Sequence, residues 1–103
     1  MPGIRDESAL ESCLAQPKTY VFDYERFPSV YQKAAAYCFF IIRLHPFFDG
    51  NKRAGLNAAS HFLQKAFIEL RADEEDLFRA IESVTVGQAE VPDLAELFRK
   101  TST

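Results

Sequence analysis

A run of nine apolar residues is the feature that most constrains the fold of this chain. Residues 34–42 read AAAYCFFII, and polar residues appear only beyond the two ends of the run. A helix that is apolar on every face must be surrounded by protein or by lipid. Nine residues are too few to cross a bilayer, which takes a helix of about 20. The run therefore predicts a helix at the centre of a bundle.

The rest of the chain shows a helical period of apolar residues, divided by Pro and Gly. We expect a short helix over 6–15 that begins at an Asp6 N-cap, the central helix over 29–44, and a third helix over 51–65. Two more are expected, one from an Asp73 N-cap to a stop at Gly87 and one from an Asp93 N-cap to residue 100. The expected fold is all-α, one domain over residues 1–103.

The apolar stripes of these helices predict the core. The expected inner residues are Leu10, Cys13 and Leu14 in the first helix, Leu56, Ala59, Leu63 and Phe67 in the third, Leu77, Phe78, Ile81 and Val84 in the fourth, and Leu94, Leu97 and Phe98 in the last. Residues 18–28 mix aromatic and charged side chains without helical period, which indicates a loop or a short extended flap.

Charge and cysteine content exclude several classes of function. Twelve Lys and Arg against fifteen Asp and Glu give a net charge of -3, which argues against a protein that grips a nucleic-acid backbone. Cys13 and Cys38 form no CxxC pair, so a zinc ribbon or a thioredoxin-like redox pair is excluded. We expect both thiols to be buried in a reducing cytoplasm, with neither a membrane span nor a signal peptide in the chain.

Residues 45–53, between the second and third predicted helices, read HPFFDGNKR. The third helix begins at Gly50 and Asn51, where unpaired backbone N–H groups and the positive end of the helix dipole favour an anion. Lys52 and Arg53 stand where that dipole disfavours cations, and a bound phosphate would compensate for this. Arg53 can add a two-pronged contact to the same anion. We predict a phosphate site formed by these four residues.

Two further side chains of the segment predict chemistry at that phosphate. Asp49 is placed to hold Mg²⁺, which prefers one or two carboxylates together with substrate oxygens, and His45 is the candidate for taking a proton. Simpler interpretations are a capping histidine, an Asp-Gly-Asn turn and a solvated first helical turn. A Walker A loop is excluded because Leu56 and Asn57 replace its Lys-Ser/Thr pair and no strand precedes it.

HPFFDGNKR resembles the signature of the Fic/Doc superfamily, HxFx[D/E]GNGRxxR, and its NKR ending is similar to the Doc (death-on-curing) toxins. The segment GIRDESALESCLAQP, the helix that leads into His45 and the later DEEDLF helix are arranged as in Doc-type chains, so the likeness covers nearly the whole chain. The resemblance implies a small Fic-fold helical bundle. Tyr20, Phe22, Tyr24 and Phe27 would then either dock a peptide target, as flaps do in Fic proteins, or cover the core.

The resemblance also implies roles for single residues. His45 would be the catalytic base that deprotonates a target hydroxyl, and Phe47 would anchor the loop in the core. The other implied roles are a Mg²⁺ carboxylate at Asp49, an anion hole at Gly50 and Asn51, and a phosphate clamp at Arg53. The resemblance thus gives His45 and Arg53 as the two catalytic residues.

Two departures from the AMP-transferring Fic pattern predict which group moves. Lys52 replaces the second glycine of that pattern, and Leu56 replaces its final arginine. Doc-type toxins are understood to bind ATP with its γ-phosphate at the anion hole and to phosphorylate a threonine of translation elongation factor Tu. We therefore expect a phosphotransferase that uses ATP and Mg²⁺. AMP transfer by the same site and an inactive Fic-fold binding module are the alternatives.

The resemblance further implies protein partners. The chain contains no [S/T]xxxE[G/N] segment, with which Fic enzymes block their own ATP site, so an antitoxin acting in trans is expected. Doc-type chains carry a further helix before the GIRD segment, and this chain opens with Met1-Pro2-Gly3. If that helix is missing, apolar surface on the N-terminal side stays uncovered, which predicts self-association or a partner.

Overall fold

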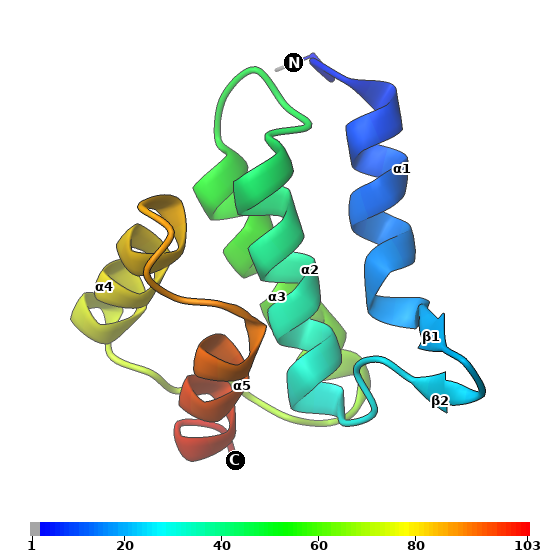
Figure 1. The fold of residues 1–103 in the computed structure, drawn as a ribbon. Coiled ribbons are helices and arrows are strands. Elements are labelled where there is room, and N and C mark those ends of the chain that lie inside the picture. Colours follow the sequence, from blue (N-terminus) through cyan, green and yellow to red (C-terminus); the bar gives the residue numbers. More distant parts are fainter. Residues whose placement is uncertain (1–2) are drawn as a thin grey trace.

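A computed structural model describes residues 3–103 as a bundle of helices with a small hairpin (Figure 1). The all-α prediction is confirmed. In chain order the elements are α1 (Glu7–Ala15), the 3₁₀ turn η1 (Gln16–Lys18), β1 (Tyr20–Val21), β2 (Tyr24–Glu25), α2 (Val30–Leu44), α3 (Asn51–Lys65), α4 (Glu74–Thr85) and α5 (Val91–Lys100). No helix in residues 3–103 combines the length and the apolar character needed to span a bilayer.

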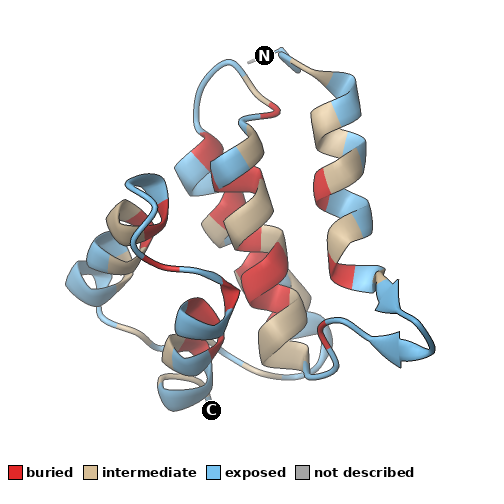
Figure 2. Cartoon of the chain, in the orientation of Figure 1, coloured by how far each residue is buried: buried red, intermediate tan, exposed pale blue. Residues whose placement is uncertain are grey.

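Helix α2 lies at the centre, as its apolar run predicts, and it contacts α1, η1, α3, α4 and α5. Its buried residues are Ala34, Ala35, Ala36, Cys38, Ile41 and Ile42. Figure 2 shows that buried positions concentrate where α2, α3 and α5 face one another. Three consecutive alanines let neighbouring backbones approach α2 closely, so the core forms around this helix.

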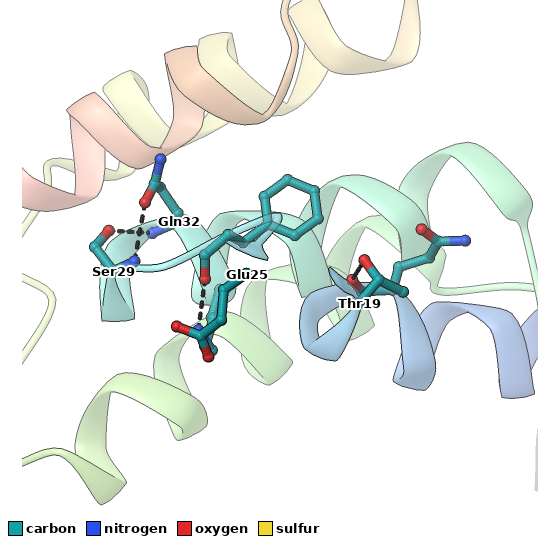
Figure 3. Close-up of polar contacts among 7 residues, drawn as sticks. Thr19, Glu25, Ser29 and Gln32 are labelled. Atoms are coloured by element: carbon teal, nitrogen blue, oxygen red, sulfur yellow. Dashed lines mark hydrogen bonds and ion pairs between the residues drawn. The ribbon is translucent and has the colours of Figure 1, made fainter. Parts of the chain in front are cut away.

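The start of α2 is fixed by a reciprocal capping box. The Ser29 hydroxyl accepts from the Gln32 backbone N–H at 3.0 Å, and the Gln32 side chain accepts from the Ser29 N–H at 2.9 Å (Figure 3). One turn on, the Lys33 ammonium pairs with Glu25 of the hairpin at 3.2 Å and also donates to the Phe27 carbonyl. The same helical turn therefore holds both the helix start and the hairpin that precedes it.

The close packing of α3 on α2 depends on Gly55. A Cβ at this position would lie 2.9 Å from the Cys38 carbonyl oxygen and 3.2 Å from Cγ1 of Ile42. Such contacts are shorter than a packed interior tolerates. Gly55 is thus a packing residue of the α2–α3 contact, in keeping with the exclusion of a Walker A loop.

The hairpin confirms the predicted flap. β1 and β2 pair antiparallel in the register Tyr20↔Glu25 and Val21↔Tyr24, with Phe22 in the turn. Phe22 has a φ of 56° and is 93% exposed, and the two tyrosines are exposed as well. Phe27, just after the hairpin, is buried instead and meets the Phe40 ring edge-on at 6.4 Å. Phe27 therefore covers the core, whereas peptide docking by the exposed aromatics stays a prediction.

The ends of helices α4 and α5 agree with the sequence interpretation except at the start of α5. Asp73 is the N-cap residue of α4 as predicted, although its side chain makes no capping hydrogen bond, and Gly87 lies past the helix end with a φ of 80°. The predicted Asp93 cap of α5 is wrong. Glu90 is the N-cap and Asp93 is its reciprocal partner at the third helical position, because Pro92 occupies the first turn, where its missing N–H costs nothing.

Three predicted core residues are exposed. The prediction that Phe67 is buried is wrong because α3 has already ended before this residue, whose backbone is left-handed with a φ of 62°. The prediction for Phe78 is wrong because the buried stripe of α4 runs through Ile81 and Val84 and leaves Phe78 at 65% exposure. Leu14 of α1 is 49% exposed, since Cys13 takes the inward position. Exposed apolar side chains thus occur on several elements, and self-association through them stays a prediction.

Candidate active site

Residues 45–50 form the loop that joins the C-terminus of α2 to the N-terminus of α3 (Figure 1). The described N-terminal segment, residues 3–6, runs along this loop. Ile4 forms an antiparallel bridge with Phe47, and the backbone N–H groups of Arg5 and Asp6 both donate to the Pro46 carbonyl, at 2.7 and 3.1 Å. The loop is therefore supported by backbone from a distant part of the sequence.

His45 is the C-cap residue of α2 and adopts the left-handed conformation, with a φ of 52° and a ψ of 56°. Its backbone N–H donates to the Ile41 carbonyl at 3.2 Å. Nδ1 lies 2.8 Å from the carbonyl oxygen of Ile42. A carbonyl only accepts hydrogen bonds, so this contact places the ring proton on Nδ1 and leaves Nε2 as the nitrogen with a free lone pair.

Asn51 ties the loop into a closed ring. Its side-chain oxygen accepts from the Phe47 N–H at 3.0 Å, and its amide nitrogen donates to the Phe47 carbonyl at 2.9 Å. Asn51 is the buried polar residue of the core, at 6% exposure. Phe47 itself is half-buried, whereas Pro46 beside it is fully buried. Pro46 and the Asn51 amide therefore anchor the loop, and the anchoring role implied for the Phe47 ring stays a prediction.

The N-terminus of α3 is open. Its N-cap is Gly50, which has a φ of 76°, and within the described chain no side chain caps this end. The first bond of the helix runs from the Ala54 N–H to the Gly50 carbonyl at 2.8 Å, so the N–H groups of residues 51–53 have no acceptor in the helix. Asp49 bonds the Gly50 N–H through Oδ1 at 2.8 Å. The second carboxylate oxygen, Oδ2, takes no part in that bond.

Lys52 and Arg53, the two cations in the first turn of α3, lie in different surroundings. The Lys52 ammonium lies 2.6 Å from a carboxylate oxygen of Glu82 on α4, so its charge is paired across the α3–α4 contact. This differs from the expectation that Lys52 adds free positive charge to the anion hole. Arg53 is exposed and lines the same cavity as His45. The contacts of Glu82 with Lys52 and of Arg5 with His45 were missed in the sequence, because the partners lie 30 and 40 positions apart and no local signal relates them.

A cavity of about 450 Å³ brings the predicted site residues together. It is lined by His45, Phe48, Asp49, Gly50, Asn51, Lys52 and Arg53. Every residue that the sequence assigned to catalysis, phosphate or metal therefore borders one cavity. Their chemical roles stay predictions.

Other reactive groups lie elsewhere. Burial raises the pKa of the Cys13 thiol to about 11 and that of the Cys38 thiol to about 12. Both cysteines are free and buried as expected, and at neutral pH both thiols are protonated and poor nucleophiles. Within residues 3–103, no group of three or more His, Cys, Asp or Glu side chains could hold a metal ion. Asp49 would need substrate oxygens and water to complete a Mg²⁺ site.

The sequence of the chain matches a known protein family over the region that contains this loop. Residues 2–63 match the family described as the Fic/DOC family. This range covers α1, the hairpin, α2, the loop and most of α3. The chain therefore belongs to the Fic/DOC family.

Two curated relatives are named after Doc. The chain is 36% identical over 70 residues to "Toxin Doc" of Mycolicibacterium smegmatis, an alignment that covers 68% of this chain and 54% of that protein. It is 27% identical over 100 residues to "Protein kinase doc" of Escherichia phage P1, covering 97% of this chain and 78% of the relative. The aligned region thus spans about half the length of the mycobacterial relative.

Proposed function

We propose that this chain is a Doc-type toxin that transfers the γ-phosphate of ATP to a hydroxyl group of a protein. One observation carries the proposal: the His45 imidazole and the open N-terminus of α3 border the same cavity. A proton acceptor and a set of anion donors are what phosphoryl transfer to a hydroxyl requires. The relative from phage P1 is named a protein kinase, which favours this reaction.

In the proposed reaction His45 acts as the base. The Ile42 carbonyl holds Nδ1, so Nε2 accepts the proton of the attacking hydroxyl. The charge that the ring gains lies at the C-terminal end of α2, where the helix dipole favours a cation. As the new bond from the hydroxyl oxygen to the γ-phosphorus forms, the bond from that phosphorus to the β,γ-bridging oxygen breaks and ADP leaves. His45 then loses its proton to water, which restores the site.

The start of α3 binds the transferred group. The N–H groups of residues 51–53 donate to phosphate oxygens, and they need no rearrangement because the Asn51 side chain and Gly50 already fix the turn. Arg53 adds a charged donor at the same cavity. Asp49 would hold Mg²⁺ through the oxygen that its bond to Gly50 leaves free. Bound there, the ion would neutralise charge between neighbouring phosphates.

The choice of the γ-phosphate depends on Leu56 more than on Lys52. An AMP transferase must hold the pyrophosphate leaving group with a second cation, and Leu56 in α3 supplies none. Lys52 is paired with Glu82, so its charge is partly neutralised before any phosphate arrives. The argument from Lys52 is accordingly weaker than the sequence indicated, and AMP transfer is the alternative that the experiment must separate.

The proposed partners follow from the relatives. A toxin requires an antitoxin, and we propose that a separate antitoxin chain inhibits this one. Translation elongation factor Tu is the first protein substrate to test, and the exposed hairpin is the proposed docking site for its target segment.

Labelled ATP tests the proposal. The enzyme is incubated with Mg²⁺, elongation factor Tu and ATP carrying the label at either the γ- or the α-phosphate, with His45→Ala and a chelator as controls. Transfer of γ-label that needs both His45 and Mg²⁺ supports the phosphotransferase. Transfer of α-label would show AMP transfer instead. No His45-dependent label in this substrate or in a lysate would favour the inactive binding module.

A further inference from the structure

The side chain of Arg5 ends at the C-terminus of α2, beside the proposed base. Its Nε donates to the His45 carbonyl at 2.6 Å, and its terminal Nη2 donates to the Leu44 carbonyl at 2.9 Å. The last carbonyls of a helix have no partner within it and carry partial negative charge. A guanidinium, with several donors in a fixed plane, satisfies two of them at once.

The backbone of Arg5 fixes the next peptide group. Its N–H donates to the Pro46 carbonyl at 2.7 Å, so one residue bonds the carbonyls of Leu44, His45 and Pro46. These carbonyls set the peptide planes on both sides of His45. Arg5 thereby controls the backbone angles of that residue.

His45 needs such control because its conformation is uncommon. A φ of 52° is left-handed, a region that is unfavourable for a non-glycine residue and persists only where the surroundings hold it. In this conformation Nδ1 lies 2.8 Å from the carbonyl oxygen of Ile42 in the last helical turn. Without the Arg5 guanidinium, the carbonyls of Leu44 and His45 would lose these hydrogen bonds.

We infer that Arg5 is a positioning residue for the proposed base: it locks the left-handed cap at His45 and so keeps Nδ1 on the Ile42 carbonyl and Nε2 free. The inference rests on the proposed role of His45 in transfer. Arg5 is not among the residues that line the cavity. Its effect should therefore appear in the chemical step and not in nucleotide binding.

The test compares three variants of the full chain. Arg5→Met removes the side-chain donors, leaves the backbone N–H on the Pro46 carbonyl and roughly keeps the length of the side chain. Arg5→Lys keeps a cation that can reach one carbonyl. Asp6→Ala is the matched control: the Asp6 carboxylate caps α1 by accepting from Ala9 at 3.0 Å and makes no contact with His45. Kcat, KM for ATP and Tm are measured for each. We expect kcat of Arg5→Met to fall about ten- to a hundredfold at nearly constant KM.

A readout without activity separates this inference from the proposed function. The chain has two histidines, so an NMR spectrum of imidazole nitrogens contains one signal set for His45 and one for the exposed His61 as internal reference. We expect the wild type and Asp6→Ala to show His45 in the Nδ1–H tautomer. Arg5→Met should show a mixture of the two tautomers, and Arg5→Lys should recover part of both kcat and the tautomer signal.

Each outcome decides the inference. A His45 signal in Arg5→Met that equals the wild type would overturn it, even if kcat fell. An equal loss of kcat and of the tautomer signal in Asp6→Ala would also overturn it, because the effect would then come from general loosening of the segment. If the wild type transferred no label but its His45 tautomer depended on Arg5, the proposed function would fail and the positioning would stand.

Discussion

The two ends of helix α2 are capped in different ways, the first by nearby residues and the second by a residue far away in the sequence. At the first end, Ser29 has extended backbone angles and forms a capping box with Gln32, in which each side chain accepts a hydrogen bond from the backbone N–H of the other residue. At the other end, His45 is left-handed at a position where glycine is the common choice. Its carbonyl is satisfied by Arg5, a residue 40 positions away. The first end is thus capped by residues of its own turn, and the second by a residue from a distant part of the chain.

Under the proposed function this difference has a reason: the second end gives up some helix stability and holds the proposed base in place. A local cap such as Ser29 stabilises the helix and does nothing else. A histidine in a left-handed cap destabilises the helix end, and what it provides is a ring held with one nitrogen bonded and the other free. Strain of this kind is usual at sites of chemistry. Mutations at the two ends should therefore change different properties.

The largest effect is expected at the functional end. His45→Ala should lower transfer about 10² to 10⁴-fold, which is the usual contribution of a general base, while ATP still binds. Initial rates with labelled ATP and titration calorimetry measure the two properties. His61→Ala, on the exposed face of α3, is the control and should keep full activity. Unchanged turnover in His45→Ala would exclude His45 as the base.

A second variant tests what holds the functional half of α2 in place. Gly55→Ala puts a methyl group 2.9 Å from the Cys38 carbonyl oxygen, which α2 cannot move without shifting the helix. Overpacking costs about 1–3 kcal/mol, more than the gain of up to about 1 kcal/mol from replacing a helical glycine. We expect a lower free energy of unfolding in urea. Asn57→Ala, exposed on the same helix, should change it by less than about 0.5 kcal/mol. A more stable Gly55→Ala would show that the two helices can separate without cost.

A third variant addresses the structural end. Ser29→Ala removes the acceptor for the Gln32 N–H and should lower the free energy of unfolding by about 1 kcal/mol. The rate of label transfer should stay at the wild-type value, because this cap lies at the far end of α2 from the loop (Figure 1). A loss of transfer in a protein that is still folded would mean that the two ends are coupled.

The smallest effect isolates the strain at His45. His45→Gly and His45→Ala both lack the imidazole, so both should be inactive. Glycine accepts a φ of 52° without penalty, whereas alanine does not. The glycine variant should therefore be the more stable by about 0.5–1 kcal/mol, after allowance for its more flexible unfolded chain. Equal stabilities in thermal denaturation would indicate that the left-handed cap is not strained.

The same contrast explains which parts of the structure the sequence predicts. Ser29 and the apolar run 34–42 are local signals, and they predict the start, length and burial of α2. The start of α5 was misplaced although its signal is also local, since Pro92 belongs at a first turn and Glu90 pairs with Asp93. Phe67 and Phe78 follow the helical period but lie beyond or beside the buried stripe, which depends on where neighbouring helices stop.

The candidate site likewise contains one part that the sequence predicts and one part that it does not. The loop residues from His45 to Arg53 are adjacent in sequence, so their meeting at one cavity was predictable. The ion pair of Lys52 with Glu82 and the bonds of Arg5 join residues from different elements. No period or motif relates those positions. Their contacts come from the packing of the whole chain, and only the three-dimensional structure identifies them.

The bond between Arg5 and His45 also has a consequence for folding kinetics. Helices α2 and α3 are neighbours in sequence, and their contact closes only a short loop, so this pair of helices can form early in folding. Closing the chain from residue 5 to residue 45 costs more conformational entropy and gains its bonds only when both partners are in place. During refolding, helical circular dichroism should recover before the His45 tautomer signal does. A newly made chain would then pass through a helical stage in which the proposed base is not yet in position.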